Sequence, residues 1–258
     1  MAKLIHSAKP ASKWTEHDLA AYNITVVHQD ITTFFGMHNL PQPTIDPAAL
    51  TATEPDGVAN DDVYRLLHKM DHVMSVAPVE ELAVSNFTML LLRAMGYDSR
   101  GRDIRMKEVM PLTICGETRH AKSDICIVDE NGVLLLIQED KERRWLSNPE
   151  PQLVAGAIAA FAANNVTRSE MPNMLPLDFK VMAGITMRGT APFFYKIEVT
   201  AALVNSVRNG AYPQAVTTVY AHVPSIPRRN RRWSEGIKTL DNRHIILSCY
   251  EAFKQFVN

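Results

Sequence analysis

Two short apolar runs, residues 125–128 and 133–137, lie on either side of a polar turn sequence near the middle of the chain. Every position in both runs is aliphatic or Cys, whereas a strand with one solvent-exposed face alternates apolar and polar side chains. Asn131-Gly132 separates the runs, and this pair favours a tight hairpin turn because both of its residues tolerate positive φ. The pattern therefore predicts an antiparallel hairpin that is covered on both faces.

Periodic segments on either side of the hairpin predict helices. Residues 61–76 repeat apolar side chains every three or four positions, which is the period of an amphipathic helix. Residues 78–97 open with Pro followed by two acids, and the Ala-rich residues 149–164 open with Pro and Glu, both of which favour a helix. Further strands are predicted at 179–187 and 192–200, and further helices at 201–208 and 245–256. The predicted fold class is α/β or α+β, with a mixed central β-sheet flanked by helices.

The first 60 residues show no comparable periodicity, and prolines are frequent between residues 41 and 55. We therefore expect an irregular N-terminal arm at 1–60. Residues 61–258 are expected to form a single domain, because a chain of this length can bury a substantial core.

The predicted turn determines which polar side chains face each other. With Asn131-Gly132 as its central residues, Asp124 lies opposite Glu139, with about 5 Å between their Cβ atoms. Lys141 comes two residues later and points to the same face. Opposed carboxylates repel each other unless a cation lies between them, and Mg²⁺ or Mn²⁺ prefers such oxygen ligands. The pattern therefore indicates a site for a divalent metal.

A different turn would change this arrangement. A three- or four-residue loop that uses Asp129 and Glu130 is the main alternative, and a slip of one residue would send one carboxylate to the opposite face. Opposite faces would remove the shared metal site, unless a β-bulge restored the facing arrangement.

Asp124 followed by Glu139-Asp140-Lys141 on a hairpin resembles the motif of the PD-(D/E)XK nuclease superfamily, which has the restriction-endonuclease-like fold. In that family a helix precedes the sheet and often supplies another acid, and a helix follows the strand that carries the Lys. The resemblance covers residues 78–200, and the whole chain also resembles uncharacterised fungal proteins built around this core.

The resemblance implies a nuclease that depends on Mg²⁺ or Mn²⁺ and hydrolyses phosphodiester bonds in DNA or RNA. Asp124 and Glu139 would hold the metal, and the main-chain carbonyl of Asp140 is a further ligand candidate. Lys141 would position the attacking water and stabilise the charge that develops on the phosphate. Gln152, on the following helix, is a candidate to line the site.

The helix before the sheet holds the candidates for an additional acid. Glu81 fits the family better by its distance from residues 91–93, and Glu80, which shares an apolar helix face, is the alternative. Two positions depart from the family pattern: Ser123 stands where many members have Pro, and Asp140 stands where an apolar residue is usual. Asp140 would point away from the metal face and needs solvent or a cationic partner, for which the candidates are Arg143, Arg144 and Lys122.

The densest basic cluster of the chain comprises Arg228, Arg229, Arg231 and Arg232, followed by Trp233. The net charge is −1, so nucleic-acid binding needs a local patch of this kind rather than overall charge. Arginines bind phosphates, and Trp can stack on a base. A nuclear localisation signal and an ordinary solvated loop are the alternatives for this segment.

Other observations limit the classes of function. The chain has no G-x-S-x-G, Walker A or G-x-G-x-x-G sequence, which argues against serine hydrolases, P-loop enzymes and Rossmann dinucleotide enzymes. It shows no secretory signal or membrane-length apolar run, so we expect an intracellular protein, cytoplasmic or nuclear, without a membrane partner. Nucleic acid is the expected partner, and a homodimer is left open. The alternative function is a catalytically silent domain that keeps the nuclease fold and binds nucleic acid or protein.

Overall fold

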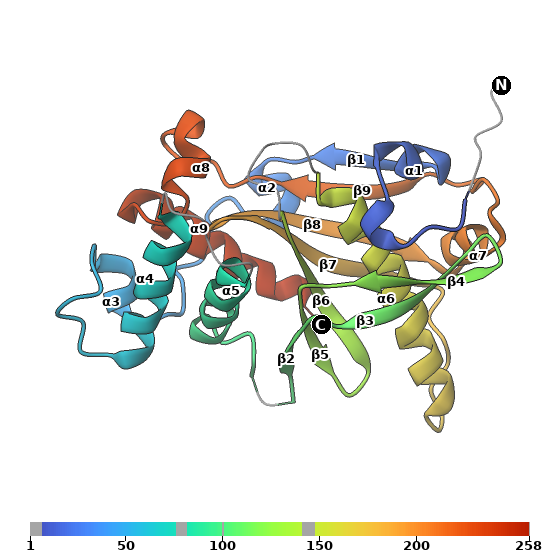
Figure 1. Ribbon diagram of the computed structural model, residues 1–258, viewed down its shortest axis with the longest axis horizontal. Coiled ribbons are helices and arrows are strands. Elements are labelled where there is room, and N and C mark those ends of the chain that lie inside the picture. Colours follow the sequence, from blue (N-terminus) through green and yellow to red (C-terminus); the bar gives the residue numbers. More distant parts are fainter. Residues whose placement is uncertain (1–6, 76–81, 100, 141–147, 258) are drawn as a thin grey trace.

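The computed structural model describes residues 7–75, 82–99, 101–140 and 148–257. Its centre is a seven-stranded mixed β-sheet with the order β1-β9-β8-β7-β6-β5-β2, and helices lie on both of its faces (Figure 1). The pairs β1–β9 and β6–β7 are parallel, and the other neighbours are antiparallel. The strands of this sheet are β1 (Ile24–His28), β2 (Asp103–Met106), β5 (Ile125–Asp129), β6 (Gly132–Glu139), β7 (Phe179–Arg188), β8 (Ala191–Thr200) and β9 (Thr217–His222).

Helices and a separate two-stranded hairpin cover this sheet. The hairpin consists of β3 (Val109–Ile114) and β4 (Glu117–Lys122). The α-helices are α1 (Glu16–Ala21), α2 (Ile31–Phe35), α3 (Pro47–Thr51), α4 (Asp61–Met74), α5 (Ala83–Ala94), α6 (Glu150–Glu170), α7 (Ala201–Asn209), α8 (Arg232–Glu235) and α9 (Leu240–Phe253). Short 3₁₀ helices are η1 (Ala11–Lys13), η2 (Arg229–Arg231) and η3 (Lys254–Phe256). The predicted class, a mixed sheet flanked by helices, is confirmed.

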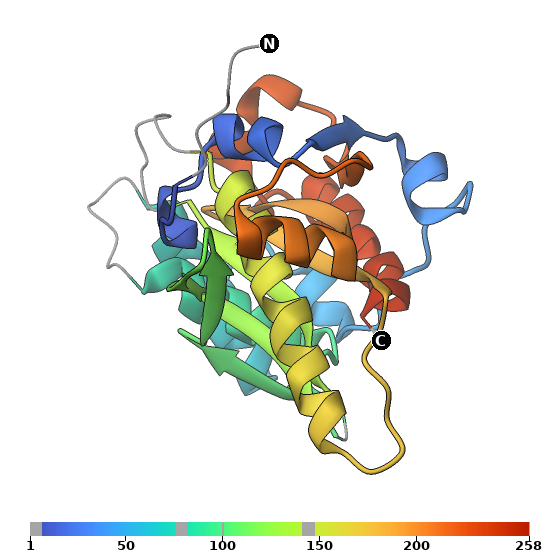
Figure 2. The ribbon, with the colours of Figure 1, turned by 90° about the vertical axis from the view of Figure 1, so that its right-hand side faces the viewer.

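The central hairpin is buried on both faces, as its apolar runs predicted. Ile125 and Ile127 pack into a core that includes residues of α4, α5 and α9, whereas Cys126 and Leu136 pack into a second core with α6. Figure 2 shows α6 lying along one face of the sheet with α7 beside it. Strand alternation therefore sends successive side chains into two different cores, which explains why neither run contains a polar residue.

The N-terminal residues are not the irregular arm that their composition suggested. β1 joins the edge of the main sheet parallel to β9. Of the three helices in this region, α1 packs on β1, α2 packs on β9, and α3 packs on α4 and α9. Asp30 and Asp46 accept hydrogen bonds from the first turns of α2 and α3, and Pro47 occupies the first position of α3. These helices have five or six residues each, so their apolar period is too short to be recognised from the sequence.

The turn of the central hairpin also differs from the predicted one. Its central residues are Glu130 and Asn131, not Asn131-Gly132. A β-bulge interrupts the pairing of β5 with β6, and beyond it each cross-strand pair is shifted by one residue, so that Ile125 lies opposite Ile137 rather than residue 138. The predicted register is therefore wrong.

A contact with α6 holds the β6 strand next to this turn. The Asn164 side-chain oxygen accepts a hydrogen bond from the Val133 N–H at 2.8 Å, and its amide donates to the Val133 carbonyl at 2.8 Å. Gly132 has a φ of 123°, and a Cβ at this position would clash with Asn164. The glycine is thus needed for the approach of α6 rather than for a type I′ turn. A constraint that comes from a helix so distant in sequence is not visible in the hairpin's own pattern.

Replacing Asn164 by Ala is expected to lower the free energy of unfolding by about 2 kcal/mol, because the buried N–H and carbonyl of Val133 lose their partners. Asn165→Ala is the matched control. Asn165 makes the same two kinds of hydrogen bond with Leu177, but at a half-buried position where water can replace it, so its loss should cost about 1 kcal/mol or less. Urea denaturation measures both values. Equal costs would contradict the role assigned to burial.

Candidate functional site

One end of each of the strands β2, β5, β6 and β7 lies on the same side of the main sheet, beyond which no further strand residues follow in these four strands. The parallel strands β6 and β7 both end there, at Glu139 and Arg188. Since β5 is antiparallel to β6, it begins at the same edge, directly after Asp124, and β2, antiparallel to β5, ends there at Met106. We refer to Asp124, Glu139 and Asp140 together as the acidic edge.

Asp124 precedes β5 and is only 6% exposed. Its Oδ2 accepts a hydrogen bond from the backbone N–H of Glu139 at 3.0 Å and another from the side-chain amide of Gln138. Its main-chain carbonyl accepts from the N–H of Lys107 at 2.9 Å. β5 begins only at Ile125, so it offers no main-chain partner to the last residue of β6. The Asp124 carboxylate takes that place by accepting the hydrogen bond of the Glu139 N–H.

Glu139, the last residue of β6, is also 6% exposed, and its Oε1 accepts a hydrogen bond from the Ser85 hydroxyl of α5. Strand alternation places its side chain on the α5 face with Ile137, whereas Asp124 is in phase with Cys126 on the α6 face. The predicted pair of carboxylates opposed on one face is therefore wrong. The two residues are instead neighbours at the sheet edge, joined through the Glu139 amide.

Asp140 has a cationic partner that the sequence did not indicate. Its carboxylate accepts a hydrogen bond from Nε of Arg188 at 2.6 Å, its side chain is 1% exposed, and its N–H donates to the Met187 carbonyl. Arg188 ends β7, and only the parallel pairing of β6 with β7 brings the two residues together. Lys122 makes no ion pair among the described residues, and the other two candidate partners, Arg143 and Arg144, lie outside them.

Three predicted site residues, Lys141, Glu80 and Glu81, lie outside the described residues. Their neighbours along the chain do reach the acidic edge. Lys141 directly follows Asp140, and Ser85, the hydrogen-bond donor to Glu139, comes four residues after Glu81.

The first turn of α6 lies close to the same edge. The Gln152 side-chain amide approaches the Lys122 carbonyl at 3.5 Å, two residues before Asp124. Glu150 hydrogen-bonds Tyr195 of β8, and burial raises the pKa of both the Glu150 carboxyl and the Tyr195 hydroxyl. Neither residue had been singled out from the sequence, because β8 comes next to α6 only in the folded sheet. The one indication in the sequence was that Glu150 stands at the start of the helix predicted after the segment that carries Lys141.

The basic cluster divides into two pairs of arginines. Arg228 forms ion pairs with Glu235 at 2.8 Å and Asp241 at 2.7 Å, and hydrogen bonding to Asp241 raises its pKa. Arg232 is 8% exposed and donates to the Pro224 carbonyl, and burial lowers its pKa. These two side chains therefore stabilise the segment itself.

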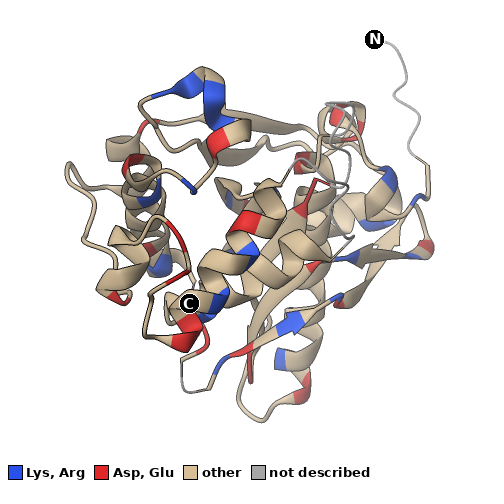
Figure 3. Ribbon diagram, turned by 60° about the vertical axis from the view of Figure 1, so that its left-hand side comes forward, with Lys and Arg blue, Asp and Glu red and all other residues tan. Residues whose placement is uncertain are grey.

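Arg229 and Arg231 face solvent instead. Arg231 is 65% exposed and lies 3.6 Å from Glu235, and Arg229 makes no ion pair among the described residues. Figure 3 shows this basic segment projecting from the body of the molecule. Of the predicted phosphate-binding arginines, these two have the exposure that such contacts require.

Trp233 connects the basic segment to the acidic edge. Its ring stacks on Phe193 with 5.7 Å between centroids, and the Arg188 guanidinium lies 4.7 Å from its ring centre. Arg188 in turn pairs with Asp140. The Trp233 ring, which was predicted to stack on a base, is therefore in contact with Phe193 and Arg188 of the protein itself.

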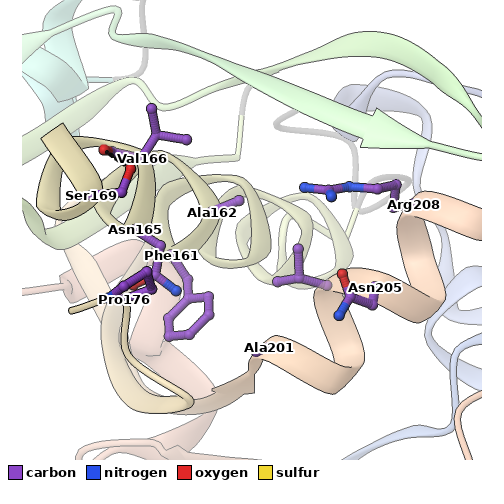
Figure 4. Close-up of a pocket in the computed structure, with 10 residues that line it drawn as sticks. Phe161, Ala162, Asn165, Val166, Ser169, Pro176, Ala201, Asn205 and Arg208 are labelled. Carbon is purple, nitrogen blue, oxygen red and sulfur yellow. Dashed lines mark hydrogen bonds between the residues drawn. The ribbon is translucent and has the colours of Figure 1, made fainter.

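A separate cavity of about 200 Å³ lies between α6 and α7 (Figure 4). Phe161, Ala162 and Val166 of α6 form one wall, and Asn205 and Arg208 of α7 form the other. Phe161 comes eleven residues after Glu150, which corresponds to about 16 Å along a helix. The cavity is therefore distinct from the acidic edge.

Within the four described stretches, no group of three or more His, Cys, Asp or Glu residues could hold a metal ion, and no helix has the length and hydropathy of a membrane span. No protein-family model matches the chain, and neither does any curated protein.

Proposed function

We propose that this protein is a nuclease that uses Mg²⁺ or Mn²⁺ to hydrolyse phosphodiester bonds in DNA or RNA. The observation that carries the proposal is the acidic edge itself: two buried carboxylates, Asp124 and Glu139, meet at the end of β6, directly before Asp140 and Lys141. Burying a carboxylate is costly, and a bound cation offsets that cost.

The arrangement of elements adds support. A helix, α5, precedes the strands and provides the Ser85 contact to Glu139, and a second helix, α6, follows the segment that carries Lys141. Both helices are features of the PD-(D/E)XK resemblance. Asp124 and Glu139 lie on opposite faces, so they do not form the facing pair on which the metal site was predicted. In this proposal both carboxylates instead reach one metal beyond the end of β6, where Asp124 accepts a hydrogen bond from the Glu139 N–H at 3.0 Å, with Glu81 as the preferred additional acid and Glu80 as its alternative. Lys141 orients the attacking water.

A panel of substrates and metals tests the proposal directly. Purified protein is incubated with single- and double-stranded DNA and RNA in Mg²⁺ or Mn²⁺, and cleavage is followed on denaturing gels. We expect at least one nucleic acid to be cut and the reaction to stop on addition of EDTA, because the metal both activates the water and neutralises the phosphate. Failure to cut any of these substrates with either metal would overturn the proposal.

The hairpin register favours a second candidate function. Asp124 and Glu139 do not share a face, and each accepts a hydrogen bond from a protein donor, as structural carboxylates do. A catalytically silent domain that binds nucleic acid or protein would have this arrangement. Calorimetry separates the two functions, because a nuclease binds Mn²⁺ and loses that binding in Glu139→Ala, whereas the silent domain binds none.

A further inference from the structure

Two exposed lysines lie close to Asp124 along the chain or across from it. Lys107 follows the last residue of β2, and Lys122 is the last residue of β4. The Lys107 N–H donates to the Asp124 carbonyl at 2.9 Å, and the N–H of Ser123, which follows Lys122, donates to the Glu108 carbonyl at 3.0 Å. These bonds fix both lysine main chains against the acidic edge.

The charges around these lysines leave them available to a ligand. Neither Lys107 nor Lys122 forms an ion pair with another described residue. The acid next to them, Glu108, lies 3.9 Å from Arg105. The junction of β2 with β3 and β4 with β5 therefore carries an excess of positive charge at the surface, in a chain whose net charge is −1.

The backbone of Lys107 is held in an unfavourable conformation. Its φ is +57°, in the left-handed region that Gly and Asn occupy more easily than Lys does. Of the four described non-glycine residues with a positive φ, which are Asn23, Lys107, Cys115 and Asn173, only Lys107 borders the acidic edge.

The position of the two lysines relative to the basic segment suggests what they bind. From β2 through β5 and β6 to β7, adjacent strands are about 4.8 Å apart, so Lys107, which follows β2, lies roughly 14 Å from the Arg188 end of the edge. Along the axis of B-DNA, a span of about 14 Å corresponds to about four phosphates of one strand. The carboxylates of the acidic edge lie between the two ends.

We infer that Lys107 and Lys122 form a site for the backbone phosphates of the nucleic-acid substrate, on the side of the acidic edge opposite to Arg229 and Arg231. This inference rests on the proposed function for the identity of the substrate. The site itself is a binding site, and its occupation does not require cleavage.

Equilibrium binding in EDTA tests the site without catalysis. Fluorescence anisotropy with labelled single-stranded and duplex oligonucleotides is measured from 50 to 200 mM salt for the full-length protein, for Lys107→Asn and Lys122→Gln, and for the double variant. Asn suits the left-handed backbone at position 107. Each substitution should reduce the slope of log affinity against log salt by about one, and the affinity advantage of the wild type over the double variant should shrink roughly tenfold across this salt range on duplex DNA.

Arg102→Ala is the matched control. Arg102 precedes β2 at the opposite edge of the sheet, about 17 Å along the strand from Lys107, which exceeds the screening length of about 10 Å at 0.1 M salt. For Arg102→Ala, the slope of log affinity against log salt should therefore equal that of the wild type. Thermal melting establishes that each variant is folded.

Each outcome addresses one claim. A double variant that binds with the wild-type slope, or a control that loses as much slope as the lysine variants, would overturn the phosphate site even if the protein cleaves nucleic acid. A lysine-dependent slope in a protein that cleaves nothing would support the site and contradict only the proposed nuclease activity.

Discussion

Replacing Asp124 by Asn is expected to lower metal-dependent cleavage by about a thousandfold, which corresponds to about 4 kcal/mol of lost transition-state stabilisation. The amide oxygen of Asn can still accept hydrogen bonds from the Glu139 N–H and the Gln138 amide, so the local structure should survive. The charge that attracts the metal is lost. Initial rates on the preferred substrate at saturating Mn²⁺ measure the effect.

Asp103→Asn provides the control for this variant. Asp103 is an exposed carboxylate at the start of β2, at the opposite edge of the sheet from Asp124, and its charge should not influence the reaction. A rate for Asp124→Asn within tenfold of the control would show that Asp124 is not a metal ligand. Loss of Mn²⁺ binding in calorimetry, together with an unchanged melting temperature, would separate a catalytic role from a structural one.

The largest effect on stability is expected at Arg243 of α9, where replacement by Ala should lower the free energy of unfolding by about 4 kcal/mol. The guanidinium is 2% exposed and donates to the carbonyls of Ala49 at 3.0 Å and Ala52 at 2.7 Å in the N-terminal region. It also donates to the carbonyls of Ile237 at 3.1 Å and Lys238 at 2.8 Å. Removal of the guanidinium would leave these carbonyls without a donor, both in the N-terminal region and in the segment before α9.

Two other substitutions separate the causes of this loss. Arg243→Lys keeps the charge but replaces a planar fork by a single ammonium, which cannot serve carbonyls on both sides, so we expect an intermediate loss of about 2 kcal/mol. Arg229→Ala removes an exposed arginine and should change stability by less than about 0.5 kcal/mol. Urea denaturation gives all three values. An Arg243→Ala protein as stable as the Arg229→Ala protein would contradict the anchoring role.

Long periodic segments were predictable because their pattern is set by the geometry of the element itself. The amphipathic repeat of residues 61–76 predicted α4, and the alternating segments at 179–187 and 192–200 predicted β7 and β8, within a residue or two at each end. Short elements were not predictable in this way. β1 and β2 have five and four residues, and they are strands because neighbours far away in the sequence supply their hydrogen bonds.

The sequence by itself therefore determined a mixed sheet flanked by helices, a central hairpin buried on both faces, and acidic residues at its open end. Only the tertiary structure decided how those acids are placed. Asn164 of α6 binds the main chain of Val133, the hairpin register moves by one residue, and Glu139 turns to Ser85 while Asp124 meets the end of β6. The physical reason is that side chains alternate along a strand with a period of two, so the one extra residue of the β-bulge between β5 and β6 changes the face on which each side chain beyond it lies.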